Sequence, residues 1–182
     1  MTNTTINWQP AHLQNELVKL VPLTENDFER LYAVASDPLI WEQHPSFDRY
    51  QRNVFQDFFA GALDSKAAFL IVDQATGEVI GSTRYYDHKE DESIAIGFTF
   101  LARQYWGGRY NQAVKELMLH YAFAYVDKVI FHIGATNLRS QIGTTRLGAI
   151  KTGEFITQDE KGPRLSYEYT LPKDAWRKGL LR

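Results

Sequence analysis

Cysteine is missing from this chain of 182 residues. The chain can therefore form no disulfide, offers no thiolate nucleophile and lacks the thiolate ligands of a cysteine zinc site. The spacing of its histidine, aspartate and glutamate residues suggests no other metal site, so we expect no metal. A chain without cysteine suits a reducing compartment, and we predict a cytoplasmic protein.

A surplus of one charge is missing as well. The chain has 20 Lys and Arg against 22 Asp and Glu, a formal net charge of -2. It has no overall basic field that would attract nucleic acid, and we expect no nucleic-acid partner. No apolar run reaches the length of a transmembrane helix, and the polar residues 1–10 do not resemble a signal peptide. We therefore expect no membrane association.

Internal repeats, low-complexity tracts and linkers rich in Gly, Pro or Ser are also absent. With 44% hydrophobic and 23% charged residues, the chain suits one globular domain with a sizeable core. We predict a flexible N-terminal segment over residues 1–15 and a single domain over 16–182.

Residue patterns predict the order of the elements. Alternating, β-rich segments indicate strands over 16–23, 67–73, 78–87, 93–102 and 128–135 and a final hairpin over 150–157 and 165–172. Helical spacing indicates helices over 24–36, 50–65 and 110–125, and a short helix over 140–149. Thr24 and Asp27 resemble a capping box, and Ser140 is well placed to cap the last helix. The order predicts an α+β fold, in which helices flank a mostly antiparallel central sheet with one β-α-β crossover over 93–135.

One helix face in this plan is predicted to point toward the core. Between residues 110 and 125, apolar side chains recur three and four residues apart. The predicted core-facing residues are Tyr110, Ala113, Val114, Leu117, Tyr121, Ala124 and Tyr125.

Gly107 and Gly108 stand directly before this helix, where a capping Ser, Thr, Asp or Asn is usual. A helix N-terminus has free backbone N–H groups and a partial positive charge, and glycine lets the backbone approach a ligand closely. The stretch therefore favours a phosphate or pyrophosphate site. It matches neither a Walker A loop nor a Rossmann glycine fingerprint. A tight turn without a ligand is the alternative.

Two motifs at a fixed separation add to this interpretation. Gln104-Tyr105-Trp106-Gly107 fits the start of an acyl-CoA motif: Gln or Arg, two variable residues, Gly, one variable residue, and Gly or Ala. Asn137 and Ser140, followed eight residues later by Gly148, form the second motif. Over residues 16–172 the chain resembles the GNAT acetyltransferase superfamily, in particular the Rim-type branch that includes ribosomal-protein N-terminal acetyltransferases.

Three positions depart from that family pattern. Arg109 stands where the acyl-CoA motif has its second Gly or Ala, and Ala113 stands where the branch has a glutamate. Thr144 stands where many members have a tyrosine as general acid. An arginine beside a pyrophosphate is electrostatically favourable, so Arg109 is compatible with the site.

The resemblance implies acetyl-CoA as co-substrate and a strand that separates from its neighbour near Phe98–Leu101. The backbone freed there would pair with the pantetheine arm and polarise the thioester carbonyl. The implied cofactor-binding residues are Phe98, Thr99, Phe100, Leu101, Gln104, Trp106, Gly107, Gly108, Arg109, Tyr110, Asn137 and Ser140. In the alternative, Ile94, Ile96, Phe98 and Phe100 are simply core positions of one alternating strand.

For catalysis, the resemblance favours Ser140 as proton donor to the leaving thiolate, with helix capping as its alternative. Glu92 is the best carboxylate for a general base, although it is also typical of a charged hairpin tip. Arg84 is predicted either to recognise a carboxylate or polar peptide in the acceptor cleft or to point to water. Trp41 either lines that cleft or packs in the core. His120 and His132 look structural.

The function implied is an N-acetyltransferase that moves an acetyl group from acetyl-CoA to a primary amine, on a protein or a small molecule, by direct attack in a ternary complex. The alternative is a non-catalytic acyl-CoA-binding module of the same fold, which Arg109 and Thr144 would favour. We expect a monomer or a homodimer, since the final hairpin offers an exposed edge.

Overall fold

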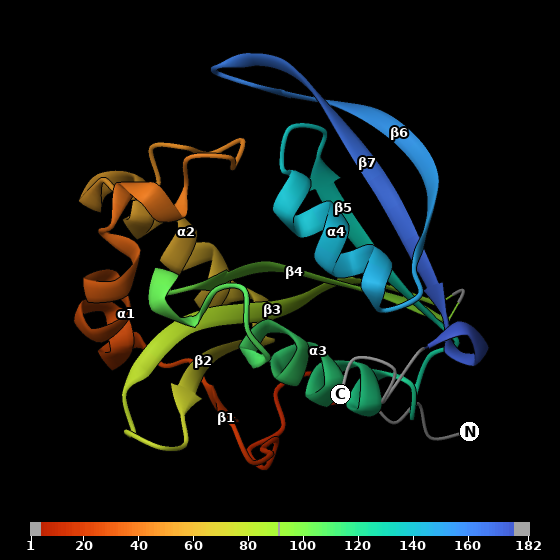
Figure 1. Cartoon of the computed structure of the whole chain (residues 1–182), viewed down its shortest axis with the longest axis horizontal. Helices are drawn as coiled ribbons and strands as arrows, with labels where there is room; N and C mark the ends of the chain where they lie inside the picture. Colours follow the sequence, from red (N-terminus) through yellow and green to blue (C-terminus); the bar gives the residue numbers. More distant parts are fainter. Residues whose placement is uncertain (1–4, 91, 177–182) are drawn as a thin grey trace.

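The chain is built on one mixed sheet of seven strands (Figure 1). The structure, a computed structural model, describes residues 5–90 and 92–176. The strands are β1 (Val18–Pro22), β2 (Ala68–Asp73), β3 (Val79–Lys89), β4 (Ser93–Leu101), β5 (Lys128–Gly134), β6 (Ile150–Asp159) and β7 (Gly162–Pro172), and they lie in the order β1-β2-β3-β4-β5-β7-β6. Among the strands of the described residues, only β4 and β5 pair in parallel. The α+β fold with one β-α-β crossover is therefore confirmed. Residues 1–4, 91 and 177–182, which the predicted segments also include, lie outside the described residues.

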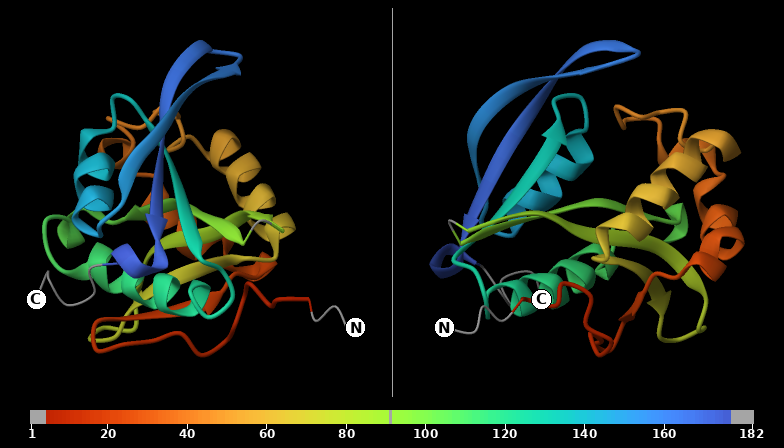
Figure 2. Two further views of the ribbon diagram at one scale, coloured as in Figure 1. Left: turned by 90° about the vertical axis from the view of Figure 1, so that its right-hand side faces the viewer. Right: turned by 180° about the vertical axis from the view of Figure 1, so that it is seen from behind.

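Helices cover both faces of this sheet (Figure 2). Helix α3 (Tyr110–Ala122) packs on one face, α1 (Phe28–Ala35) and α2 (Arg52–Ser65) pack on the other, and α4 (Leu138–Arg146) accompanies β5. Alternation along β2 serves both layers, because Phe69 and Ile71 join the core under α3 while Leu70 joins the core under α1 and α2. In the described part of the chain, no helix is both long and apolar enough to span a bilayer.

Two helix starts test the capping predictions. The capping box before α1 is confirmed, since the Thr24 backbone N–H donates to the Asp27 carboxylate at 2.8 Å. The prediction that Ser140 caps α4 is wrong. The helix begins three residues earlier than Ser140 requires, and Asn137 is the cap, its side-chain oxygen accepting from the Ser140 N–H at 3.3 Å.

The core-facing side of α3 is rotated from the predicted one. Its buried residues are Ala113, Val114, Lys115, Met118, Leu119 and Ala122, whereas Tyr110, Leu117 and Tyr121 are only partly buried at the edge. Large aromatic residues suggested the wrong stripe because they cover the border of the core, where the tyrosine hydroxyls find polar partners.

A β-bulge interrupts β4. Arg84 of β3 pairs with Gly97 and Ser82 pairs with Phe100, so Phe98 and Thr99 together stand opposite one residue of β3. Phe98 has φ of 52°, a left-handed conformation that is rare for a large side chain. The extra residue reverses the alternation, because Ile94 and Ile96 pack under α3 while Phe100 packs under α1 and α2. One uninterrupted alternating face over 94–100 is therefore wrong.

The strands β4 and β5 separate from Ile96 onward, which is two residues before the predicted range Phe98–Leu101. Their parallel pairing covers only Ser93–Ala95 with Lys128–Ile130, and β5 then continues along β7 as far as Gly134. In the described residues, no strand pairs with the β5-facing edge of β4 from Ile96 onward. The sheet thus opens into a V whose apex lies next to the bulge (Figure 1).

Residues 5–15, part of the segment predicted to be flexible, lie against the domain. Leu13 is buried in the core under α3, and the Gln9 side chain donates to the Ala68 carbonyl at 2.7 Å. Trp8 packs against Tyr85, with their ring centroids 5.0 Å apart.

Candidate active site

The loop before α3 and the start of α4 meet beside the opening of the sheet. The Arg139 guanidinium lies 3.6 Å from the centre of the Trp106 ring, which ties the two predicted motifs together. The Trp106 indole N–H in turn donates to the Leu101 carbonyl at 2.9 Å, at the end of β4. Residues far apart in the sequence therefore converge on the free edge of β4.

The two glycines of this loop leave an open surface. Gly107 has φ of +71°, and a Cβ added at Gly107 or at Gly108 would meet nothing within 4 Å. Arg109 holds the cap position of α3, without a side-chain hydrogen bond to the helix. The first N–H groups of α3 therefore lack a side-chain cap and lie next to exposed glycines, an arrangement that suits an anion.

Tyr110, one of the predicted cofactor residues, also anchors the loop. Its hydroxyl donates to Asp73 at 3.1 Å, and the Tyr105 hydroxyl reaches the other oxygen of the same carboxylate at 3.5 Å. Gln104, in contrast, is exposed on the turn. The loop is thus fixed on β2 through its tyrosines.

A buried amino group lies beneath the bulge. Lys115 of α3 is only 7% exposed, and its Nζ donates to the Thr99 hydroxyl at 2.7 Å. Thr99 also contacts the Thr83 hydroxyl at 2.8 Å. Burial lowers the pKa of Lys115 to about 7. No sequence pattern marks this residue, because a lysine between Val114 and Glu116 is typical of a solvated position.

On the face of the sheet opposite to α3, side chains from three strands form a chain of hydrogen bonds. The Tyr86 hydroxyl lies 2.9 Å from His132 Nδ1, and His132 Nε2 lies 3.3 Å from the Glu168 carboxylate. Burial raises the pKa of Tyr86 well above its usual value, so the phenol stays protonated at neutral pH. We call Tyr86, His132 and Glu168 the relay. No sequence signal joins them, because each comes from a different strand.

The relay stands at the apex of the V. A Cβ added to Gly97, at the bulge, would lie 2.9 Å from the Tyr86 ring. The rings of Tyr86 and Phe98 have centroids 5.1 Å apart. A cavity of about 200 Å³ borders His132 and Glu168 from the side of the β3–β4 turn. The relay therefore touches both the bulge and a space that admits a small molecule or water.

The family of this chain follows from its similarity to known proteins. The model of the acetyltransferase (GNAT) domain matches residues 18–150, which is more than half of the chain. This chain belongs to the GNAT acetyltransferase family. A comparison with curated proteins gave no match.

Solved GNAT structures share the fold at low sequence identity. A probable GNAT acetyltransferase from Chromobacterium violaceum superposes with a TM-score of 0.81 at 18% identity, covering 91% of this chain and 88% of that one. RimJ of Mycobacterium smegmatis, in complex with CoA-disulfide, gives 0.65 at 15% identity over 86% and 82% of the two chains. Spermidine N-acetyltransferase of Vibrio cholerae, in complex with CoA and spermine, gives 0.65 at 14% identity over 88% and 98%. At these identities the likeness concerns the fold.

The predicted cofactor residues of β4 use their side chains and their backbone differently. The side chains of Phe100 and Leu101 are buried in the two cores, and the Thr99 hydroxyl bonds to Lys115. What β4 offers to a ligand along its free edge is therefore backbone. Phe98, 38% exposed, also offers its ring, on the face that carries Tyr86.

Ser140 occupies the third position of α4, half-buried, with its N–H bonded to Asn137. Asn137 uses one lone pair of its side-chain oxygen for this cap, so its amide nitrogen and the second lone pair of that oxygen are left for a ligand. Thr144 follows one turn later and is buried. Its short side chain puts no hydroxyl where a tyrosine would reach.

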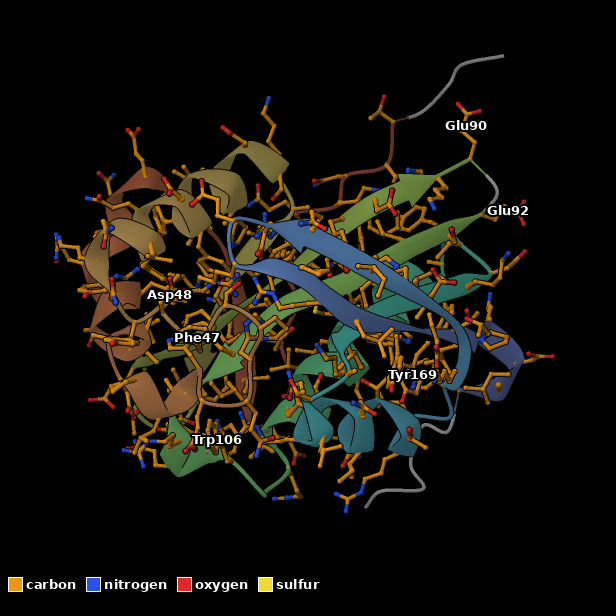
Figure 3. The ribbon with its side chains drawn as sticks, turned by 90° about the horizontal axis from the view of Figure 1, so that it is seen from above. Phe47, Asp48, Glu90, Glu92, Trp106 and Tyr169 are labelled. Carbon is orange, nitrogen blue, oxygen red and sulfur yellow. The ribbon has the colours of Figure 1, made fainter. Side chains whose placement is uncertain are left out.

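Glu92 does not join these groups. It lies in the turn between β3 and β4, six residues before Phe98, which is about 20 Å along an extended strand. Figure 3 shows Glu92 and Trp106 at opposite corners of the molecule. The Glu92 carbonyl accepts from the Asp127 N–H at 2.9 Å and thereby fastens the turn. Strand register thus separates Glu92 from the bulge.

The predicted acceptor residues have different environments. Arg84 is 7% exposed, so the alternative that it points to water is wrong. Trp41 is 2% exposed, and its indole N–H donates to the Ala35 carbonyl at 2.8 Å. Trp41 therefore has a packing position, with its ring 4.9 Å from that of Phe100. Across residues 5–90 and 92–176, no three His, Asp or Glu side chains are grouped to hold a metal ion.

Proposed function

We propose that this GNAT protein is a cytoplasmic, acetyl-CoA-dependent N-acetyltransferase that acts on a primary amine in a ternary complex. The observation that carries the proposal is the V between β4 and β5, with the glycine loop and the start of α4 gathered beside it. Two structurally similar proteins are solved with CoA-type ligands, a CoA-disulfide in one and CoA in the other.

The residues present suit acetyl-CoA as co-substrate. The N-terminus of α3, with Gly107, Gly108 and Arg109, would hold the pyrophosphate. The free edge of β4 at Phe98–Leu101 would pair with the pantetheine amides, and one of its N–H groups would polarise the thioester carbonyl. When bound, acetyl-CoA supplies an acetyl group already activated as a thioester.

The relay would handle the proton of the acceptor. As the amine nitrogen bonds to the acetyl carbon, the Tyr86 oxygen accepts the amine proton while its own proton passes to His132 Nδ1. Glu168 stabilises the resulting imidazolium, in the manner of the carboxylate in a catalytic triad. Ser140 donates a proton to the sulfur as the carbon–sulfur bond breaks, and it regains one from solvent. In this proposal His132 is catalytic and not merely structural.

The chemistry asks little more of the protein. An α-amino group has a pKa near 8, so roughly a tenth is neutral at pH 7. Most of the rate enhancement can then come from holding the amine against the thioester, with a modest contribution from proton transfer. An intact V that holds the amine against the thioester and an aligned relay that accepts its proton are sufficient for this rate enhancement.

Isothermal titration with acetyl-CoA tests the binding site. Gly107→Trp should abolish micromolar binding because an indole would fill the space that the backbone leaves open. Gly162→Trp is the matched control, since Gly162 has φ of +97°, a Cβ added there would meet nothing within 4 Å, and the residue lies in the turn between β6 and β7. Binding by the control but not by Gly107→Trp supports the site. No binding by the wild type would overturn the proposal. If acetyl-CoA binds but no amine tested is acetylated with release of free CoA, the non-catalytic module is left.

A further inference from the structure

Within residues 5–90 and 92–176, Arg84 is a buried cation without a counter-ion. Its guanidinium lies 3.5 Å from the centre of the Phe98 ring and 5.5 Å from that of Phe58. Its Nε is buried without a hydrogen-bond partner, and no described carboxylate forms an ion pair with it. Stacking on aromatic rings compensates only part of the lost hydration.

A second arginine approaches the same ring. Arg49 lies 4.6 Å from the centre of the Phe58 ring and 5.2 Å from that of Trp41. Its neighbour Asp48 is bound to Lys161. Burial lowers the pKa of both guanidinium groups to about 10, and the charge of Arg84 acts in the same direction on Arg49. Both groups nevertheless remain charged at neutral pH.

The surroundings of these two arginines are also positive. Burial lowers the pKa of His44 to about 3, assisted by the charges of Arg49, Arg164, Arg139 and Lys161. The acidic groups nearby are already engaged, because Asp48 pairs with Lys161 and Asp159 pairs with Arg164. Figure 3 shows Phe47 and Asp48 on this loop, which Lys161 links to the tip of the β6–β7 hairpin.

This positive cluster adjoins the relay. Arg84 and Tyr86 are two residues apart on β3, about 7 Å, and both contact the Phe98 ring. A molecule lying along Phe98 therefore meets Tyr86 at one end and the two arginines at the other. A separation of a few ångströms suits an amine and an acid group on the same small molecule.

We propose that the acceptor is a primary amine that also bears a carboxylate, of the amino-acid type, and that Arg84 and Arg49 bind this carboxylate. The inference rests on the proposed acetyl transfer. A carboxylate supplies the counter-ion that Arg84 lacks among the described residues, and charge-assisted hydrogen bonds to a buried guanidinium are strong. A polyamine would bring further positive charge to a site already positive, so spermidine and spermine are rejected.

Matched acceptor pairs test the proposal. Acetyl-CoA turnover is measured with a panel of L-amino acids and with their amides, which keep the amine and the side chain but lack the carboxylate, and with spermidine. We expect kcat/KM for the best acid to exceed that of its amide by at least ~10-fold, as one strong charge-assisted bond provides. Arg84→Met should raise KM for the acid ~10–100-fold and leave the amide unaffected, and Arg49→Met should act in the same direction.

Arg52→Met is the matched control. Arg52 also stacks on aromatic rings, 5.0 Å from Phe28, but it is paired with Glu29 and exposed. Its replacement should leave the preference for the acid unchanged. Since Arg84 is an unpaired buried charge, Arg84→Met should not lower the melting temperature, so a loss of binding is not a loss of folding.

The outcomes separate this proposal from the proposed function. Equal turnover of acids and amides, turnover of spermidine, or an unchanged preference in Arg84→Met would overturn the carboxylate site. If no amine is acetylated, binding of the same amino acids and of their N-acetyl derivatives is measured by thermal shift, which tests the carboxylate site without acetyl transfer. Stabilisation of the wild type but not of Arg84→Met would support the carboxylate site although acetyl transfer had failed. No stabilisation of the wild type would overturn both.

Discussion

In the proposed reaction, proton transfer depends on single side chains next to the bulge. The Tyr86 hydroxyl contacts His132, which in turn contacts Glu168, so removing one member should interrupt proton transfer. We expect Tyr86→Phe and His132→Gln each to lower kcat by roughly 10²–10³, the usual share of acid–base catalysis, with acetyl-CoA affinity unchanged.

Steady-state kinetics and titration calorimetry on the same preparations measure both effects. Tyr85→Phe is the control, because it removes the neighbouring hydroxyl on the opposite face, where Tyr85 donates to the Met118 carbonyl. A normal kcat in Tyr86→Phe would exclude the relay and return His132 to a structural role.

Lys115 provides a prediction of stability against pH. Its pKa falls from 10.5 to about 7 on folding because of burial. Between these values the unfolded chain binds more protons than the folded one, so this residue makes the free energy of unfolding increase from pH 7 to about pH 10. Lys115→Met should raise that free energy by roughly 1–3 kcal/mol at pH 6 and by less at pH 10.

Urea denaturation at both pH values checks this, with the exposed Lys19→Met as control. An equal effect of Lys115→Met at pH 6 and pH 10 would contradict a buried, easily deprotonated amine.

Among the elements, the pairing of β3 with β4 determines where the bulge lies. A Cβ on Gly81 would stand 1.9 Å from the Phe100 carbonyl oxygen, a backbone atom that cannot simply rotate away. We expect Gly81→Ala to shift this pairing and to lower the melting temperature by at least several degrees, together with activity.

Gly153→Ala on β6 is the comparison, since its nearest neighbour would be the Glu168 Cβ at 3.8 Å, an ordinary contact. Thermal unfolding monitored by circular dichroism measures both variants. A Gly81→Ala protein as stable as Gly153→Ala would show that β4 can move without cost.

For the molecule as a whole, the opening of the sheet divides it into two parts joined by a short parallel pairing. Only Ser93–Ala95 pair with β5, and the V beyond them offers unpaired backbone in the described residues. Acetyl-CoA should bridge the two sides and slow amide exchange over residues 97–111. At 100 times the Kd the stabilisation is about 2.7 kcal/mol, or up to ~100-fold slower exchange.

Hydrogen–deuterium exchange with and without acetyl-CoA measures this, with β1 as internal reference because it lies at the far edge of the sheet, next to β2. Protection restricted to the α3 loop, without any in β4, would argue against pantetheine pairing along the bulge.

The sequence alone determined the elements and the family. Strand alternation and helical spacing are local patterns, and the two motifs of the acyl-CoA loop and α4 are short stretches of chain. They predicted the order of the strands and helices and the capping box of Thr24 and Asp27. The family resemblance implied an opening near Phe98–Leu101, and the strands separate from Ile96 onward. Family membership followed from the same residues and agrees with the match over 18–150.

Only the tertiary structure decided which side chains meet. The reversal of β4 at Phe98 depends on a left-handed backbone that the pairing with β3 imposes, so no alternation pattern could reveal it. Tyr86, His132 and Glu168 come from three strands, and Arg84 and Arg49 from a strand and a distant loop. Glu92 is near the bulge in sequence yet remote in space, because an extended strand converts each residue into about 3.3 Å of distance. Local propensity therefore determines the helices and strands, and the long-range register of the strands determines which side chains meet in the candidate active site.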